Sequence, residues 1–270
     1  MKITFIGGGN MAIALIGGLI KNGAAASEIK VVEPQAENRA KLTTDFGVTC
    51  YAALEDAALD CAVLVLAVKP QQLREALAPM AGKLGVQLVL SIAAGVRMAD
   101  ISRWLGGYTR LVRSMPNTPA LIGEGITGLC KHPSVDATAQ LEAEQVLRAV
   151  GQTLWVDDEA MIDAVTAISG SGPAYVFYFI EALIAAARKL GFSAESARQL
   201  ALTTFRGATA LAASSDDEVA VLRQRVTSKG GTTEAALKSL DADQVQAAIL
   251  RAVQAAETRG HELGDLLGKD

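Results

Sequence analysis

Short apolar runs alternate with helical patterns over the first part of the chain. Runs rich in β-branched residues are typical of strands, and apolar residues that recur every three or four positions are typical of helices. The strand candidates are residues 3–6, 29–32, 48–51, 62–68, 88–92 and 111–113. The helix candidates between them are residues 11–22, 36–46, 71–84 and 98–105. Strands that alternate with helices predict βαβ units and a mostly parallel sheet.

The strand signal disappears after about residue 159, and the remaining apolar patterns all have helical spacing. The helix candidates there are residues 161–168, 174–190, 194–213, 218–227, 233–240 and 242–263. We therefore expect an α/β, Rossmann-like dinucleotide-binding domain at residues 1–157 and an all-α domain for substrate binding and dimerisation at residues 158–270.

The helix predicted near residues 173–187 is apolar around most of its circumference. A helix of this kind has to be enclosed on nearly all sides, which a helical region of modest size achieves with difficulty. It carries Glu181 and, at its predicted length, is too short to span a bilayer. We expect a second copy of the chain to cover it in a homodimer or a higher oligomer.

Composition narrows the class of protein. Half of the 270 residues are hydrophobic and the formal net charge is −4, without a cluster of Lys and Arg, so we expect no nucleic-acid partner. Cys50, Cys61 and Cys130 have no metal-ligand spacing, and we interpret them as reduced thiols. The first apolar run stops at three glycines, unlike a signal peptide. We expect a soluble cytoplasmic protein with no metal and no membrane partner.

A glycine-rich turn follows the first predicted strand. The residues Gly7-Gly8-Gly9-Asn10-Met11-Ala12 have the G-x-G-x-x-A form of the dinucleotide fingerprint. The first glycine permits a tight turn, Gly9 lets the backbone approach a pyrophosphate, and Ala12 lets the helix pack closely on the strand. The strand and helix lie where this mechanism requires them, so the motif predicts a site for NADPH or NADH, formed by Ile6, Gly7, Gly8, Gly9, Asn10 and Met11.

Glu33 stands at the end of the second predicted strand. An acidic side chain there can bind a ribose 2′-hydroxyl and repel a 2′-phosphate, which favours NADH. Arg39 is close enough in sequence to bind a 2′-phosphate instead, and Pro34 can turn Glu33 away. The sequence leaves both cofactors open, as well as an ordinary solvated role for Glu33.

Three further segments begin where parallel strands are predicted to end, the edge at which open α/β sheets bind ligands. We expect them to line the nicotinamide half of the cofactor site. The alternatives are that Lys69 and Pro70 simply begin the next helix and that Asn117 is a turn residue. The candidate residues are Ala67, Val68, Lys69, Pro70, Ala93, Ala94 and Asn117.

Glycines and hydroxyls are combined in the segment Ser228-Lys229-Gly230-Gly231-Thr232-Thr233, where a helix is predicted to begin. Backbone N–H groups at a helix N-terminus bind carboxylates. The alternative is a helix start capped by a Ser or Thr side chain.

These segments together resemble the pyrroline-5-carboxylate reductase family over nearly the whole chain. The segments that carry the resemblance are Ala67–Pro70, Ser91–Gly95, Arg113–Pro119 and Val226–Thr233. The chain departs from the family pattern at Lys229, where the family usually has proline. The resemblance implies reduction of 1-pyrroline-5-carboxylate to L-proline by NADPH or NADH, the final step of proline biosynthesis, and an intertwined homodimer.

The resemblance also assigns roles to the second segment. Thr233 is implied as the catalytic hydroxyl beside the ring nitrogen, and the substrate carboxylate is held by Ser228, Gly230, Gly231 and Thr232. A protonated ring imine is already electrophilic, so its reduction demands no metal and no covalent nucleophile. Position is the main requirement, and the two histidines, His132 and His261, lie in no motif.

Two other classes of protein have to be weighed. β-Hydroxyacid dehydrogenases also place helices after a Rossmann domain, and the segment that begins at Ile168 resembles theirs. At the positions of their lysine and asparagine, however, this chain has Val176 and Ile180. A non-catalytic nucleotide sensor on the same fold would not need the second, hydroxyl-rich segment.

Overall fold

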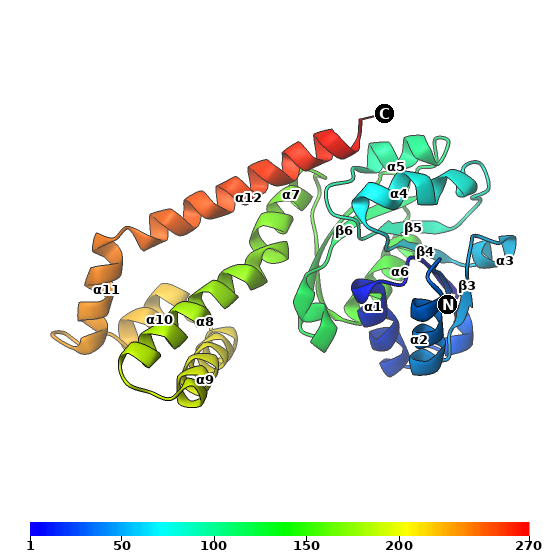
Figure 1. The fold of residues 1–270 in the computed structure, drawn as a ribbon. Helices are drawn as coiled ribbons and strands as arrows, with labels where there is room; N and C mark the ends of the chain where they lie inside the picture. Colours follow the sequence, from blue (N-terminus) through cyan, green and yellow to red (C-terminus); the bar gives the residue numbers. More distant parts are fainter. Residues whose placement is uncertain (270) are drawn as a thin grey trace. The chain divides into compact units, whose positions relative to one another are not determined.

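The computed structural model describes residues 1–269, and its chain forms two compact units (Figure 1). Of the described residues, the first unit comprises 1–171 together with 256–269, and the second comprises 172–255.

The first unit is built on one eight-stranded sheet, in the order β3-β2-β1-β4-β5-β6-β7-β8. All neighbouring strands are parallel except β6 and β7, which are antiparallel. The strands are β1 (Ile3–Ile6), β2 (Ile29–Val32), β3 (Thr49–Tyr51), β4 (Val63–Leu66), β5 (Leu88–Ser91), β6 (Leu111–Met115), β7 (Gly125–Lys131) and β8 (Gly151–Trp155). The predicted α/β class with a mostly parallel sheet is confirmed.

Helices cover both faces of this sheet, so that the strand residues of its centre are buried throughout. One face packs against α1, α2 and α6, through side chains such as Leu15, Leu42 and Val146. The other packs against α4 and α5, through Leu73 and Ile101. The helices of this unit are α1 (Asn10–Lys21), α2 (Ala36–Phe46), α3 (Asp56–Leu59), α4 (Pro70–Leu77), α5 (Met98–Trp104), α6 (Ala137–Arg148) and α7 (Met161–Val165).

The second unit contains helices only. They are α8 (Gly172–Lys189), α9 (Ala194–Ala213), α10 (Val219–Arg225), α11 (Thr232–Ala242) and the first part of α12 (Val245–Leu267). α8 and α9 pack against each other. Gly191 follows α8 with φ +97°, a left-handed conformation that ends a helix and favours glycine.

The apolar helix is longer than the sequence predicts. A π-helical turn, Thr166–Gly170, joins α7 to α8, so that residues 161–189 form one helical run. By length and composition this run could cross a membrane, which corrects the expectation that it is too short. A helix buried between protein subunits has the same composition. No residue of α8 is buried within the chain.

The end of α12 is part of the first unit, to which residues 256–269 belong. Arg97 Nη2 lies 2.7 Å from Asp265 Oδ1, and this guanidinium holds the pKa of Asp265 below its usual range. Gly264 lies against the same guanidinium, because a Cβ at this position would be 3.1 Å from its Nε. The helix ends at Leu267 rather than near residue 263 as predicted.

Candidate active site: a glycine-rich loop and an uncapped helix start

Gly7 has a backbone conformation and a packing position that require glycine. Its φ is +102°, and a Cβ there would lie 2.8 Å from the carbonyl oxygen of Ala67. Its N–H donates to the carbonyl of Val32 at 2.9 Å. The chain therefore turns out of β1 in close contact with the ends of β2 and β4.

Gly9, by contrast, faces open space. A Cβ there would meet no protein atom within 4 Å. Gly9 is the N-cap of α1, and no side chain caps this helix start. Ala12 is fully buried, so the helix packs closely where the fingerprint predicts it. The first N–H groups of α1 are thus free to bind phosphate oxygens, and the residues present fit a dinucleotide.

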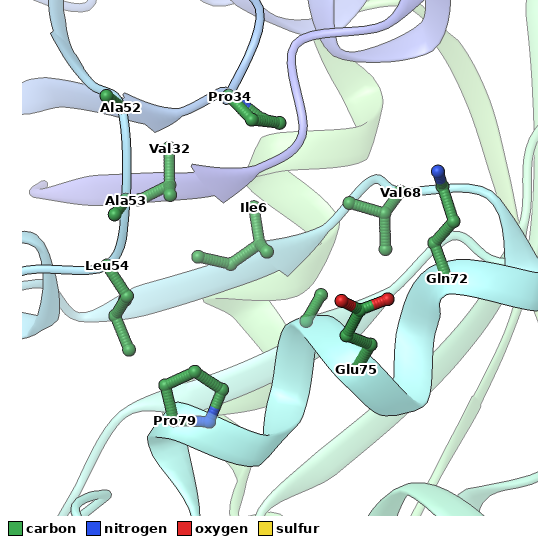
Figure 2. A pocket seen from close by; sticks show the side chains of 11 residues that line it. Ile6, Val32, Pro34, Ala52, Ala53, Leu54, Val68, Gln72, Glu75 and Pro79 are labelled. Carbon is green, nitrogen blue, oxygen red and sulfur yellow. The ribbon is translucent and has the colours of Figure 1, made fainter.

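A cavity of about 430 Å³ lies beside this loop, at the carboxyl ends of β1, β2 and β4. Figure 2 shows the apolar side chains of Ile6 and Val32 at the strand ends, and Val68 close to Gln72 and Glu75 of α4. An apolar slot with a few polar groups at its edge is suited to a flat aromatic ring. The sequence predicted Ile6 and Val68 for the cofactor site but gave no signal for Gln72 and Glu75.

Glu33 is turned inward. Its Oε2 accepts the N–H of Gly8 at 2.9 Å, and its Oε1 accepts the N–H of Gln35 at 2.8 Å. The residue is 7% exposed. Arg39 lies on the outer side of the same turn, where its Nη1 donates to the carbonyls of Glu33 and Pro34. The Glu33 carboxylate thus lies against the glycine loop, whereas the Arg39 guanidinium lies at the end of β2.

The nicotinamide-side candidates all follow strand ends in the first unit. Lys69 is exposed and is the N-cap of α4, with Pro70 as its first residue, so this pair does begin a helix. Ala93 is buried and Ala94 exposed after β5. Asn117 is 9% exposed and its Oδ1 accepts the N–H of Ile126 at 3.0 Å, which ties the loop after β6 to β7.

The second candidate segment leads into α11, in the second unit. Gly231 is the N-cap of this helix, and no side chain caps it. Within residues 1–269, the hydroxyls of Ser228, Thr232 and Thr233 take part in no hydrogen bond. A Ser or Thr cap, the alternative interpretation of this segment, is therefore wrong. Free hydroxyls and free N–H groups meet at one helix N-terminus.

Glu234 holds the turn before this helix in shape. Its Oε2 accepts the N–H of Gly230 at 2.6 Å, and its Oε1 lies 3.2 Å from Lys238 Nζ. The Gly230 N–H, and secondarily Lys238, keep the pKa of Glu234 below its usual range. Gly230 has φ +75°, and a Cβ on Gly231 would lie 2.5 Å from Ser228 Oγ. Sequence analysis missed Glu234, although a Glu three residues after an N-cap is a recognised capping signal.

The segment that resembles β-hydroxyacid dehydrogenases forms the π-helical turn and the start of α8. Val176 and Ile180 lie on α8, so neither of the polar side chains that those enzymes use is present there. The histidines lie in neither part of the site: His132 contacts Ser134 through Nδ1, and His261 lies near Asp265 on α12.

Comparisons with known proteins show which family the chain resembles. The family model "Pyrroline-5-carboxylate reductase dimerisation" matches residues 159–263, and "NADP oxidoreductase coenzyme F420-dependent" matches residues 2–95. The chain is 48% identical to the pyrroline-5-carboxylate reductase of Pseudomonas aeruginosa, over 99% of this chain and 98% of that one. It is 40% identical to that of Haemophilus influenzae, over 98% of each chain.

Solved structures show the same relationship. A pyrroline-5-carboxylate reductase from Coxiella burnetii superposes with a TM-score of 0.90 at 41% identity, covering 97% of this chain and 98% of that one. The Plasmodium falciparum pyrroline carboxylate reductase, solved with NADP bound, superposes with a TM-score of 0.87 at 30% identity and 98% coverage of both chains.

The Rossmann-like sheet and its open glycine loop define an oxidoreductase that uses NADPH or NADH. Its helical part carries the dimerisation region of one family of such enzymes. The chain belongs to the pyrroline-5-carboxylate reductase family. The family resemblance and the fold class predicted from the sequence are both confirmed.

Proposed function

We propose that this chain reduces 1-pyrroline-5-carboxylate to L-proline with hydride from NADPH or NADH, the last step of proline biosynthesis. Family membership over the whole chain supports this activity. The structural observation that carries it is the start of α11, an uncapped helix N-terminus with three hydroxyls nearby. Such a site suits a small substrate that carries a carboxylate.

The cofactor site comprises the glycine loop and the segments that follow the strands of the first unit. The pyrophosphate is held by N–H groups at the start of α1, next to the open face of Gly9. The bound nicotinamide supplies the hydride. We assign to this site the residues Ile6, Gly7, Gly8, Gly9, Asn10, Met11, Glu33, Ala67, Val68, Lys69, Pro70, Ala93, Ala94 and Asn117.

The substrate carboxylate binds at the start of α11. Thr232 and Thr233 are the first two residues of this helix, so their N–H groups have no partner within it, and the helix dipole favours a negative charge there. The Ser228 hydroxyl supplies a further donor. Gly230 and Gly231 give the turn before the helix its backbone conformation. They do not bind the carboxylate themselves, because the Gly230 N–H is already bound by Glu234.

The Thr233 hydroxyl acts at the ring nitrogen. Hydride transfer to the imine carbon converts the C=N bond to a single bond, and the nitrogen keeps its proton as the amine of proline. A hydroxyl that is hydrogen-bonded to this nitrogen orients the ring. It also keeps the hydrogen bond while the positive charge on the nitrogen is lost during hydride transfer. Thr233 is half-buried and its hydroxyl has no other partner in the described structure, so it is available for this role.

Residues 1–157 form the dinucleotide-binding domain in this proposal, and residues 158–270 form the substrate-binding and dimerisation domain. The exposed apolar side chains of α8 and the matching dimerisation model support a homodimer or a higher oligomer built from such dimers. We place the enzyme in the cytoplasm, where its thiols stay reduced.

One assay separates this function from the two alternatives. We expect 1-pyrroline-5-carboxylate to drive oxidation of NADPH or NADH and to yield L-proline. A β-hydroxyacid dehydrogenase would instead reduce NAD⁺ or NADP⁺ with a 3-hydroxy acid. A sensor would bind the nucleotides without turnover of either substrate, and either of these results would contradict the proposal.

A further inference from the structure

We propose that Glu33 is a positioning residue that braces the glycine loop from inside, rather than a residue that reads the ribose of the cofactor. The inference rests on the proposed dinucleotide site, and it specifies what Glu33 does there. An acidic residue at the end of the second strand is usually expected to bind the ribose 2′-hydroxyl. The geometry of Glu33 points to a different role.

The carboxylate is committed to two backbone groups. Its two oxygens accept from Gly8 N–H and Gln35 N–H, at 2.9 and 2.8 Å. Hydrogen bonds to a charged acceptor are roughly twice as strong as neutral ones. A carboxylate that turned outward to a ribose would lose both of them and leave two N–H groups unpaired.

Packing holds the side chain in the same place. A Cβ on Gly8 would lie 2.7 Å from Leu42 Cδ1 and 3.2 Å from Glu33 Oε2, so loop, Glu33 and α2 are in close contact. Leu42 is fully buried. The N–H of Glu33 itself donates to the carbonyl of Tyr51 at 2.9 Å, which anchors the brace to β3.

The hydrogen bond to Glu33 leaves the three glycines of the loop with different roles. Gly7 packs on Ala67 and Val68, which follow β4, and the Gly8 N–H is bonded to Glu33, so both glycines face the protein. Only Gly9 faces open space. A glycine-rich loop is flexible when nothing holds it, and ordering it on binding costs affinity. Glu33 therefore prepares the loop for the pyrophosphate, which NADPH and NADH share.

This role has a consequence for cofactor choice. A brace stabilises the loop equally for both cofactors, whereas a ribose reader favours NADH over NADPH. Dissociation constants of the two cofactors, measured without substrate by quenching of protein fluorescence, distinguish the roles. Glu33→Gln keeps the size of the side chain and puts an amide donor against one of the two N–H groups.

We expect Glu33→Gln to weaken NADPH and NADH by the same factor, about tenfold, as the loss of one charged hydrogen bond implies. Gly8→Ala, which pushes on the same carboxylate, should reproduce this pattern. Glu37→Gln is the matched control, because Glu37 is exposed in the first turn of α2, and it should leave both constants unchanged. If Glu33→Gln does not fold, Glu33→Asp keeps the charge but shortens its reach, and it should weaken both cofactors equally.

Two outcomes would overturn the proposal. A change in the ratio of the two dissociation constants would show that Glu33 reads the ribose. A lower melting temperature of the free protein with both constants unchanged would show a purely structural role. Failure of the proposed function would appear separately, as a wild-type protein that binds both cofactors but does not reduce 1-pyrroline-5-carboxylate.

Discussion

Polar side chains at helix starts are used in two different ways in this chain. Asp136 caps α6 by accepting the N–H of Ala139, and Ser193 caps α9 by accepting the N–H of Ser196. At α11 the cap is Gly231, although Ser228, Thr232 and Thr233 are all close in sequence. Within residues 1–269 these three hydroxyls make no hydrogen bond, and this is the residue-level observation behind the substrate site that we propose.

Thr233→Val removes the hydroxyl and keeps the shape of the side chain. A hydrogen bond to a charged group contributes about 1.5–3 kcal/mol, so kcat/KM for the imine should fall by about ten- to a hundredfold. The melting temperature should hardly change, because this hydroxyl makes no hydrogen bond in the part of the chain that the structure describes. Steady-state kinetics and a thermal unfolding scan measure the two effects.

Thr138→Val is the control for this variant, since Thr138 is likewise the second residue of a helix, α6, and is exposed. It should leave both kinetics and stability as they are. A destabilised Thr233→Val protein with wild-type kcat/KM would contradict the catalytic assignment.

Gly9 and Gly7 should respond differently to added side chains. Gly9→Val meets open space in the free protein, so it should fold and yet bind NADPH and NADH at least about tenfold more weakly, because it blocks the pyrophosphate. Gly7→Ala clashes with Ala67 at a positive φ, so it should lower the melting temperature as well. Unchanged cofactor affinity in Gly9→Val would show that the pyrophosphate does not approach there.

Arg113 links secondary-structure elements that the sequence alone could not connect. It lies on β6 and is 2% exposed, with Nη2 2.7 Å from Asp163 of α7 and Nη1 3.2 Å from Glu159. Glu159 also accepts the N–H of Met98, the first residue of α5. One buried guanidinium thus joins β6 to α7 and, through Glu159, to α5.

Arg113→Met should lower the free energy of unfolding by about 3–5 kcal/mol, because it leaves the buried Asp163 carboxylate without its ion-pair partner. Urea unfolding measures this loss. The matched control is Arg148→Met, which breaks the surface pair with Glu144 and should cost less than about 1 kcal/mol. Equal effects of the two variants would contradict the structural role of Arg113.

Elements with clean periodicity could be predicted from the sequence, and the others could not. β1, β2 and α2 have the predicted bounds. β7 gave no strand signal because glycines interrupt its sequence, Gly125-Ile126-Thr127-Gly128-Leu129, and glycine lowers strand propensity. α12 extends past residue 263 through Gly264, where the contact with Arg97 favours a small residue. Tertiary contacts decide such positions.

In the candidate site, too, local sequence patterns could be predicted and tertiary contacts could not. The glycine fingerprint and the helix start after residue 228 are local patterns, so their residues could be named from the sequence. The orientation of the Glu33 carboxylate depends on Gly8, 25 residues away in the chain. The cavity walls come from α4 and from the loop after β3. No local pattern specifies contacts of this kind.

At the scale of the whole molecule, the exposed apolar surface of α8 is the feature that requires a partner. Val176, Phe177, Tyr178 and Leu183 are between 44% and 71% exposed, and the matching family model describes dimerisation. An exposed apolar surface of this kind marks a protein interface.

Phe177→Asp should weaken the homodimer, because it places a charge in an apolar interface. Light scattering at micromolar concentration should give a dimer mass for the wild type and a lower mass for the variant. Ile122→Asp, at a position that is 79% exposed in the first unit, should leave the dimer intact. A monomeric wild-type protein would contradict the assembly that we propose.

Transfer of deuterium from the cofactor to the product tests the central claim most directly. The enzyme is incubated with 1-pyrroline-5-carboxylate and NADPH deuterated at nicotinamide C4, on the face from which hydride is transferred. Mass spectrometry and NMR then locate the label. Our account predicts L-proline with one deuterium at Cδ, the former imine carbon. Proline without this label, or no proline despite bound cofactor, would contradict it.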